Sequence, residues 1–236
     1  MPATMDKFGI RIGVVADVVC AWSYIGKRRL EKAMEITSDL YTFQVDYFPF
    51  ELHPHTPEEG LDYHDYLRRK FGGEDHFVAL TSHIRRVAAR EGLSFNLHLQ
   101  HTIPNTRNAH RIIMFAREQG KQEEVVEGFF RAYFTEGVDL TRKENLIAIA
   151  EEAGLDAEKT GYLLNSNTGK LEIEMAEKEL QDLGITSAPL YIINDRVTIS
   201  GAQSVETFTR AFHRVAEEEG GSHPEMSSWA EENQTF

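Results

Sequence analysis

The only cysteine of the 236-residue chain, Cys20, is the residue best suited to nucleophilic chemistry. It directly precedes a predicted helix, where unpaired backbone N–H groups and the positive end of the helix dipole favour a thiolate. A free thiol with a pKa of ~8.5 is about 3% ionised at pH 7, and lowering that pKa by about one unit gives roughly 24%. The competing interpretation is a small, buried and inert side chain. Position alone does not separate the two.

Ser23 stands three residues after Cys20, at the end of the tetrapeptide Cys-Ala-Trp-Ser. A second cysteine at this spacing would attack a mixed disulfide and release the product, which a serine cannot do. The serine hydroxyl can still donate a hydrogen bond to a thiolate, either that of Cys20 or that of a bound thiol ligand. The alternative is an ordinary polar residue in the first turn of a helix.

Two further segments could bind a ligand through their backbone. Pro189 precedes a predicted strand, and a cis peptide bond there would expose the backbone of Ala188 to an extended ligand, although most X–Pro bonds are trans. Gln203 and Ser204 stand at the start of the last predicted helix, whose N–H groups can hold a carboxylate. The simpler interpretation is that Ser204 only caps this helix.

The ten histidines of the chain do not form a convincing metal site. His53 and His55 flank a proline, and His98 and His101 are separated by two residues. Neither pair has a cysteine or an acidic residue at a suitable ligand spacing, so we predict that no metal is bound.

The charge and the termini of the chain exclude several function classes. A net charge of −13 without a Lys/Arg cluster argues against nucleic-acid binding, because phosphate backbones repel such a protein. The N-terminus lacks the pattern of a signal peptide, and no stretch approaches the roughly 18 apolar residues of a membrane span. One cysteine cannot form an internal disulfide. We therefore expect a cytoplasmic protein without nucleic-acid or membrane partners.

The elements that must position these residues begin with a strand, a helix and a second strand. Residues 9–16 end in a continuous apolar run, as in the middle of a sheet. Residues 21–36 carry an apolar stripe at helical spacing, and residues 41–47 alternate apolar and polar side chains. This order is typical of a parallel βαβ unit.

The rest of the chain predicts a helical block followed by two strands and a helix. Residues 60–183 hold four amphipathic helical stripes without a strong strand, and the turn at Asn194 and Asp195 predicts a hairpin. We therefore predict an α/β thioredoxin topology with a large all-helical insertion. The predicted parts are a discontinuous thioredoxin-like domain, the insertion and a flexible tail, at residues 8–58 with 184–217, 59–183 and 218–236.

Residues 17–27 (Asp-Val-Val-Cys-Ala-Trp-Ser-Tyr-Ile-Gly-Lys) resemble the active-site segment D-x-x-C-P-W-C-Y-x-G of the FrnE branch of the DsbA-like thioredoxin family. Kappa-class glutathione transferases and 2-hydroxychromene-2-carboxylate isomerases share this architecture. The resemblance runs from about residue 10 to 215, and four further segments match in the same order, at residues 50–54, 105–111, 132–137 and 187–203.

The resemblance implies a thioredoxin fold in which Pro189 is a cis-proline facing the active site and the helical block covers it. It also implies that Asn105 and His110 line the cleft between the two parts, and that an extended thiol compound pairs with the backbone of Ala188. The candidate catalytic residues are Cys20 and Ser23. The candidate substrate- or glutathione-binding residues are Trp22, Asn105, His110, Ala188, Pro189, Gln203 and Ser204.

Two departures from the family pattern direct the functional hypothesis. Ala21 replaces the proline, and Ser23 replaces the second cysteine, which puts a dithiol oxidase in doubt. The serine-bearing members of the wider group are glutathione-dependent transferases and isomerases. The first hypothesis is therefore a glutathione-dependent transfer, addition or isomerisation on a small organic electrophile. Glutathione would lie along Ala188 and Pro189, with its γ-glutamyl carboxylate near Gln203 and Ser204. Either Ser23 or Cys20 would stabilise its thiolate.

Two alternatives stay open. In a monothiol oxidoreductase, Cys20 would attack a glutathione mixed disulfide and free glutathione would resolve the product. In a binding or scaffold protein, the chemistry would have been lost with the second cysteine. The expected partner is thus a small electrophile or a glutathione mixed disulfide, and assembly as a homodimer is left open.

Overall fold

A four-stranded mixed sheet is the central layer of the computed structural model, which describes residues 7–219. β1 (Phe8–Ala16) pairs in parallel with β2 (Tyr41–Pro49) and antiparallel with β5 (Leu190–Ile193). β5 pairs antiparallel with β6 (Val197–Ser200), so that the strand order is β2-β1-β5-β6. The predicted thioredoxin topology is confirmed.

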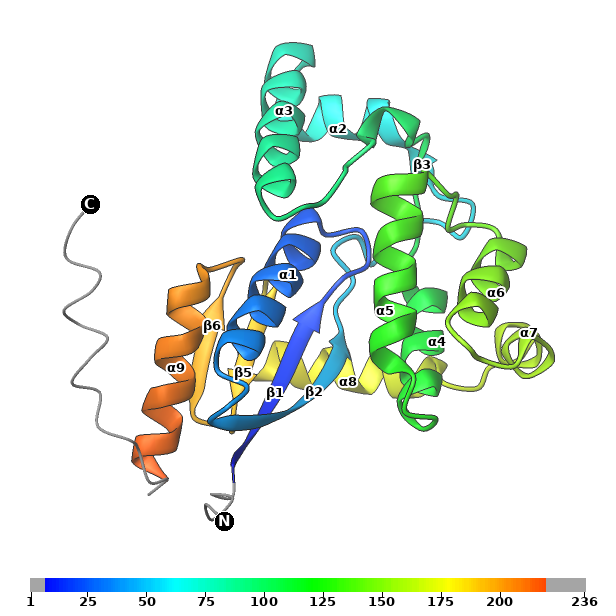
Figure 1. Cartoon of the computed structure of the whole chain (residues 1–236). Coiled ribbons are helices and arrows are strands. Elements are labelled where there is room, and N and C mark those ends of the chain that lie inside the picture. The colour runs from blue at the N-terminus through cyan, green and yellow to red at the C-terminus, as the bar shows by residue number, and fades with distance from the viewer. Residues whose placement is uncertain (1–6, 220–236) are drawn as a thin grey trace.

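Helices lie on both faces of the sheet (Figure 1). α1 (Ala21–Ile36) and α9 (Val205–Glu218) pack against each other on one face, while α8 (Lys170–Asp182) crosses behind the strands. α1 connects the parallel strands β1 and β2, as a βαβ unit requires. The predicted tail starts at the last residue of α9 and, from residue 220 onward, lies outside the described residues.

The segment between β2 and α8 is mostly helical. The four predicted amphipathic stripes are found in α4, α5, α6 and α8. The elements of this segment are α2 (Tyr63–Phe71), α3 (Glu74–Arg90), a short 3-10 turn (Leu97–Leu99), α4 (Arg107–Arg117), α5 (Gln122–Arg131), a π-helical turn (Ala132–Glu136), α6 (Lys143–Glu152) and α7 (Ala157–Asn165). A two-residue ladder between β3 (Leu61–Asp62) and β4 (Thr102–Ile103) was not predicted.

α2 and α3 form an arm that stands apart from the sheet in Figure 1. Among the described side chains of α3, only Phe77 and Ala88 are buried. A helix that buries so little apolar surface has only a weak apolar periodicity, and the sequence therefore did not predict α3.

A stack of aromatic rings joins α1 to the helical insertion. The ring of Tyr24 lies 4.8 Å from that of Phe130 and 5.8 Å from that of Phe95. Phe95 in turn stacks on Phe134 at 4.6 Å. All four side chains are buried and belong to the same hydrophobic cluster as the residues of the sheet. The helix that begins at the cysteine is therefore packed on both sides, by the sheet and by the insertion.

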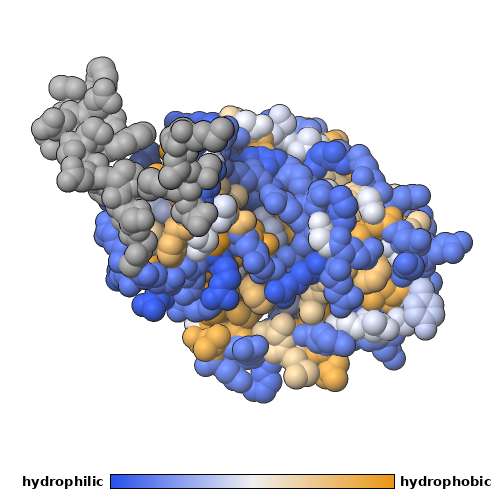
Figure 2. All heavy atoms as spheres, turned by 60° about the horizontal axis from the view of Figure 1, so that its bottom comes forward, coloured by the Kyte–Doolittle hydropathy of each residue, from blue (hydrophilic) through white to orange (hydrophobic). Residues whose placement is uncertain are grey.

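The face of the molecule shown in Figure 2 is mostly hydrophilic, with apolar patches between the charged residues. This fits the net charge of −13. Within residues 7–219, none of the helices is both long enough and apolar enough to cross a bilayer.

Candidate active site

Cys20 ends the short loop after β1 and is the N-cap residue of α1, with extended backbone angles (φ −88°, ψ 108°). Its carbonyl accepts hydrogen bonds from the N–H groups of Ser23 (3.0 Å) and Tyr24 (3.3 Å), which form the first helical turn. Its own N–H donates to the carbonyl of Asp17 (3.0 Å). Only 5% of the residue is exposed. The thiol thus lies at the positive end of α1 but is largely shielded from solvent.

The segment that leads into β5 faces this thiol. The Ala188–Pro189 peptide bond is cis. The Cys20 thiol donates to the carbonyl of Ala188, with Sγ and O 3.7 Å apart. The carbonyl of Pro189 accepts a hydrogen bond from the N–H of Gly201 (2.8 Å), which ties the segment to the turn before α9. The structure therefore contains the cis-proline that the resemblance implied, close to Cys20.

Burial dominates the ionisation of the Cys20 thiol. It raises the pKa of Cys20 above the ordinary value, and the negative charge of Asp17 acts in the same direction. The hydroxyl of Ser23 and the N–H groups of Ser23 and Trp22 act to lower the pKa, but they do not outweigh burial. Of the two interpretations of Cys20, the raised pKa favours the small, buried side chain. The helix terminus favours the thiolate, but the surrounding core disfavours it more strongly.

Two buried hydroxyl groups lie at the start of α1: that of Ser23, in its first turn, and that of Tyr191 on β5, which packs against Gly26. Ser23 is 3% exposed and Tyr191 is 0% exposed; the Ser23 hydroxyl lies beside the Cys20 thiol, and the Tyr191 hydroxyl has no hydrogen-bond partner among the described residues. The hydroxyl of Tyr191 fills the space that a side chain at Gly26 would occupy. Burial raises the pKa of Tyr191, and so does the nearby Cys20. The sequence did not single out Tyr191 as a site residue. The only signal for its position was Gly26, the glycine of the matched segment, against which the Tyr191 hydroxyl packs.

Trp22 and Asn105 have different surroundings. Trp22 is partly exposed, and its ring lies 6.1 Å from that of His83 on α3, so the arm formed by α2 and α3 borders the site. Asn105 uses its amide to hold two loops together. Its Nδ2 donates to the carbonyl of Thr56 (2.9 Å), and its Oδ1 accepts from the N–H of Arg107 (3.0 Å). Asn105 therefore has a structural role in this state.

Gln203 and Ser204 are exposed at the start of α9. Ser204 is the N-cap and accepts a hydrogen bond from the N–H of Thr207 (3.3 Å), which is the simpler of the two sequence interpretations. The neighbouring Ala202 accepts a hydrogen bond from Arg29, in the middle of α1 (2.6 Å). Arg29 is nine residues beyond Cys20. The same turn also approaches Gly26, six residues beyond Cys20, and the N–H of Gly201 is bonded to Pro189, so the turn lies beside the segment that faces the thiol.

Asp17 and His110 begin a row of buried charges beside the loop that carries the thiol. Asp17 is 0% exposed and His110 is 2% exposed, and Asp17 Oδ1 lies 3.5 Å from His110 Nε2. Further along, Glu51 pairs with Arg107 Nε (2.8 Å) and donates its N–H to Glu177 (2.9 Å). The resemblance placed His110 in a cleft. In the structure its side chain is buried, and it extends from α4 toward Asp17 at the end of β1. The acidic members of the row were not singled out from the sequence.

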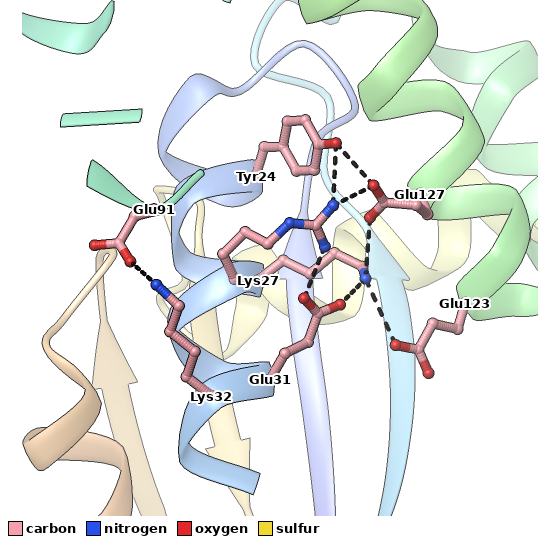
Figure 3. A network of polar contacts seen from close by, with 8 residues as sticks. Tyr24, Lys27, Glu31, Lys32, Glu91, Glu123 and Glu127 are labelled. Carbon is pink, nitrogen blue, oxygen red and sulfur yellow. Dashed lines mark hydrogen bonds and ion pairs between the residues drawn. The ribbon is translucent and has the colours of Figure 1, made fainter. Parts of the chain in front are cut away.

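α1 is fixed to the insertion by an ion-pair network around Lys27 (Figure 3). Only 4% of the Lys27 side chain is exposed, and its Nζ contacts Glu31 on the same helix and Glu127 (3.2 Å) and Glu123 (3.5 Å) on α5. Tyr24 donates to Glu127 at 2.7 Å. A groove of about 730 Å³ lies over this network, and the thiol does not line it. We interpret the network as an anchor for the helix that begins at the thiol.

The site offers polar groups that could bind a sulfur-containing ligand. In residues 7–219, no three His, Cys, Asp or Glu side chains are grouped so that they could hold a metal ion. The hydroxyl of Ser23 lies beside the Cys20 thiol and lowers its pKa, the N-terminus of α1 favours negative charge, and the backbone of Ala188 can pair with an extended ligand. The site lacks a second thiol because the chain has one cysteine.

A βαβ…ββα sheet with a cis-proline opposite the N-terminal cysteine of α1 defines a thioredoxin-fold protein. Residues 11–213 match the DSBA-like thioredoxin domain family, and the chain belongs to this family.

Three solved structures are similar over nearly the whole chain. A probable DsbA oxidoreductase from Streptomyces coelicolor is 28% identical, with a TM-score of 0.81 and 92% of each chain covered. A 2-hydroxychromene-2-carboxylate isomerase is 16% identical, with a TM-score of 0.64, covering 90% of this chain and 100% of the other. The cytosolic disulfide reductase DsbM from Pseudomonas aeruginosa, solved with GSH, is 16% identical, with a TM-score of 0.62, covering 88% and 99%. The relatives thus include oxidoreductases and an isomerase.

Proposed function

We propose that this protein is a glutathione-dependent enzyme that acts on a small organic electrophile by transfer, addition or isomerisation. The observation that carries the proposal is the buried hydroxyl of Ser23, which stands where a second thiol would stand and lies close enough to the Cys20 thiol to lower its pKa. A hydroxyl at the N-terminus of α1 can donate to a thiolate that the protein does not itself supply. The structural neighbour solved with GSH supports glutathione as the source of that thiolate.

In the proposed reaction the sulfur of glutathione forms a new bond to an electrophilic carbon. The thiol proton goes to solvent, and in an addition the carbon framework takes up a proton in return. In a transfer, the leaving group departs with the electron pair of its bond. In an isomerisation, the sulfur is expelled again after the double bond has shifted, which regenerates glutathione. Ser23 stabilises the thiolate, and the backbone of Ala188 holds the extended peptide.

A second candidate is a monothiol oxidoreductase, which is favoured by the contact between the Cys20 thiol and the Ala188 carbonyl. The Cys20 thiolate would attack the glutathione sulfur of a glutathione mixed disulfide and release the other sulfur as a thiolate. Free glutathione would then attack the new disulfide, giving oxidised glutathione and regenerating Cys20. The burial of Cys20 and its raised pKa weaken this candidate. Both candidates require a reducing compartment rich in glutathione, and we propose the cytoplasm.

Two variants separate the candidates, with glutathione binding measured by calorimetry and turnover measured with 1-chloro-2,4-dinitrobenzene and with a glutathione mixed disulfide. The proposal expects Ser23→Ala to weaken turnover of the electrophile at least about tenfold, about 1.4 kcal/mol of lost transition-state stabilisation, while Cys20→Ser retains it. Ser38→Ala, at the far end of α1, is the matched control and should behave like the wild type.

If Cys20→Ser instead abolishes reduction of the mixed disulfide while Ser23→Ala leaves it intact, the monothiol oxidoreductase is the better description. If glutathione does not bind at all, both enzymes are rejected in favour of a binding protein.

A further inference from the structure

Asp17 and His110 come from the two separate parts of the fold and meet in the core. Asp17 lies directly after β1, three residues before the thiol, and His110 lies in the first turn of α4 in the insertion. Asp17 Oδ1 and His110 Nε2 are 3.5 Å apart, and the two residues are 0% and 2% exposed. A buried carboxylate needs a compensating charge, and the imidazole of His110 is placed to provide it.

Asp17 also holds the loop that carries the thiol. Its Oδ2 accepts a hydrogen bond from the N–H of Leu52 (2.7 Å), and its Oδ1 is 3.4 Å from the N–H of Val19. Its carbonyl accepts from the N–H of Cys20 (3.0 Å). These hydrogen bonds hold the carboxylate beside the loop that carries the thiol. Its negative charge opposes ionisation of Cys20 at any pH at which that charge is not balanced.

Apolar burial and nearby acidic groups act on His110 in opposite directions. Burial by itself lowers the pKa of His110, but Asp17, Glu51 and Glu177 raise it, and the net effect is a pKa above the ordinary value. Arg107, on the same helix, is paired with Glu51 and so offsets part of that negative charge.

Two more groups face the pair from other elements. Tyr47 on β2 lines a small cavity together with His110, and burial holds its pKa well above the ordinary value, so it stays neutral near pH 7. His53, in the loop after β2, is within electrostatic reach of Asp17, but burial and the charge of Lys70 lower its pKa. Of these two histidines, His110 is the one that is better able to carry a proton.

We propose that His110 is a positioning residue that acts on Cys20 through Asp17, by balancing the charge of the carboxylate that holds the loop of the thiol. While His110 is protonated, the pair is neutral and the thiol ionises at a lower pH. When His110 loses its proton, the uncompensated charge of Asp17 suppresses the thiolate. This inference shares one premise with the proposed function, namely that a thiolate takes part in the chemistry of the site.

The single cysteine makes a direct test available, since any thiol reagent reports on Cys20 alone. The midpoint of the alkylation rate by iodoacetamide against pH is measured for the wild type, His110→Gln, Asp17→Asn and the double variant. We expect His110→Gln to move the midpoint upward by at least about half a pH unit and to slow alkylation at pH 7 about threefold. Asp17→Asn should move the midpoint downward, and the double variant should lie between the two.

Opposite directions are the signature of charge compensation, because a purely structural role would loosen the loop in both single variants and move both midpoints the same way. Shifts in the same direction, or an unchanged midpoint in a folded His110→Gln protein, overturn the proposal. Should Asp17→Asn fail to fold by circular dichroism, His110→Gln alone decides. His98→Gln, at an exposed position of the insertion, is the matched control.

Calorimetry with glutathione on the wild type keeps the two proposals apart. Opposite midpoint shifts without glutathione binding would reject the proposed function and leave this inference standing. Glutathione binding without midpoint shifts would reject this inference alone.

Discussion

The sulfur of Cys20 lies 3.7 Å from the carbonyl oxygen of Ala188, so the protonated thiol donates a hydrogen bond to the backbone that precedes the cis-proline. The same carbonyl would repel a thiolate. The resting site is therefore arranged around a neutral thiol, and chemistry at this position requires either a ligand that replaces this contact or a change in the nearby charges.

The first prediction concerns stability at alkaline pH. Burial raises the pKa of Cys20 in the folded protein, whereas the unfolded chain has the ordinary value of about 8.5. A thiol whose pKa is raised in the folded state contributes to the free energy of unfolding. This contribution is fully present below about pH 8.5 and is lost as the pH rises through the folded-state pKa. Urea unfolding at pH 7.5 and at pH 9.5 should therefore show a larger loss of stability for the wild type than for Cys20→Ala. An equal loss in both proteins would show that the thiol ionises normally.

The second prediction concerns the contact between Gly26 and Tyr191. Replacing a glycine inside a helix by alanine usually stabilises a protein by about 1 kcal/mol. At Gly26 the new methyl group would collide with the Tyr191 hydroxyl, and we expect a loss of about 1–3 kcal/mol in the free energy of unfolding. Tyr191→Phe removes the hydroxyl, which has no partner, and should cost little by itself and restore much of the loss in the double variant.

The matched control for this pair is Gly161→Ala in α7, where a methyl group would meet only an ordinary contact at 3.7 Å. It should be neutral or stabilising. If the double variant is no more stable than Gly26→Ala alone, the collision is not with the hydroxyl.

The third prediction concerns the anchor at Lys27. Lys27→Met removes the buried cation that Glu31, Glu123 and Glu127 share. We expect a loss of about 1–3 kcal/mol by chemical denaturation, less than for a fully buried ion pair because the carboxylates are partly exposed. Lys178→Met, which breaks an exposed pair with Asp182, is the control and should stay within about 0.5 kcal/mol of the wild type.

The same variant has a predicted pH dependence. Burial acts to raise the pKa of Glu127, but Arg28 and Lys27 hold it below the ordinary value. A lowered folded-state pKa gives stability that is present above the unfolded value of about 4.3 and is lost as the pH falls through the folded-state pKa. The difference in stability between the wild type and Lys27→Met should therefore shrink in acid. A difference that is constant from pH 7 to pH 3 would contradict an electrostatic anchor.

The fourth prediction concerns Arg111, which is 1% exposed and ties α4 to the end of α7. Its guanidinium donates to the carbonyls of Thr168 (2.8 Å) and Ser166 (2.9 Å) and also contacts the carbonyl of Leu163. A lysine has no planar fork and cannot reach all of these acceptors. Arg111→Lys should lower the free energy of unfolding by more than about 2 kcal/mol and speed hydrogen exchange in α7. The exposed Arg142→Lys serves as the control, and an equal effect of both would refute the assignment.

Most of the secondary structure could be predicted because it is encoded by neighbours along the chain. The apolar run of β1, the alternation in β2 and the turn at Asn194 and Asp195, both with positive φ (47° and 57°), are local signals. α2 and α3 were not predicted, because a helix that stands away from the core needs few apolar residues. Its sequence pattern then resembles that of a solvated segment.

The sequence by itself located the candidate site, since the only cysteine stands at the junction of a strand and a helix and Ser23 follows it three residues later. The charge state of that cysteine was decided only by the tertiary structure. Burial under α1, the Ala188 carbonyl and the Asp17–His110 pair all involve residues far apart in the chain that meet when the insertion packs onto the sheet. Desolvation and charge act through space, so a pattern along the sequence cannot report them.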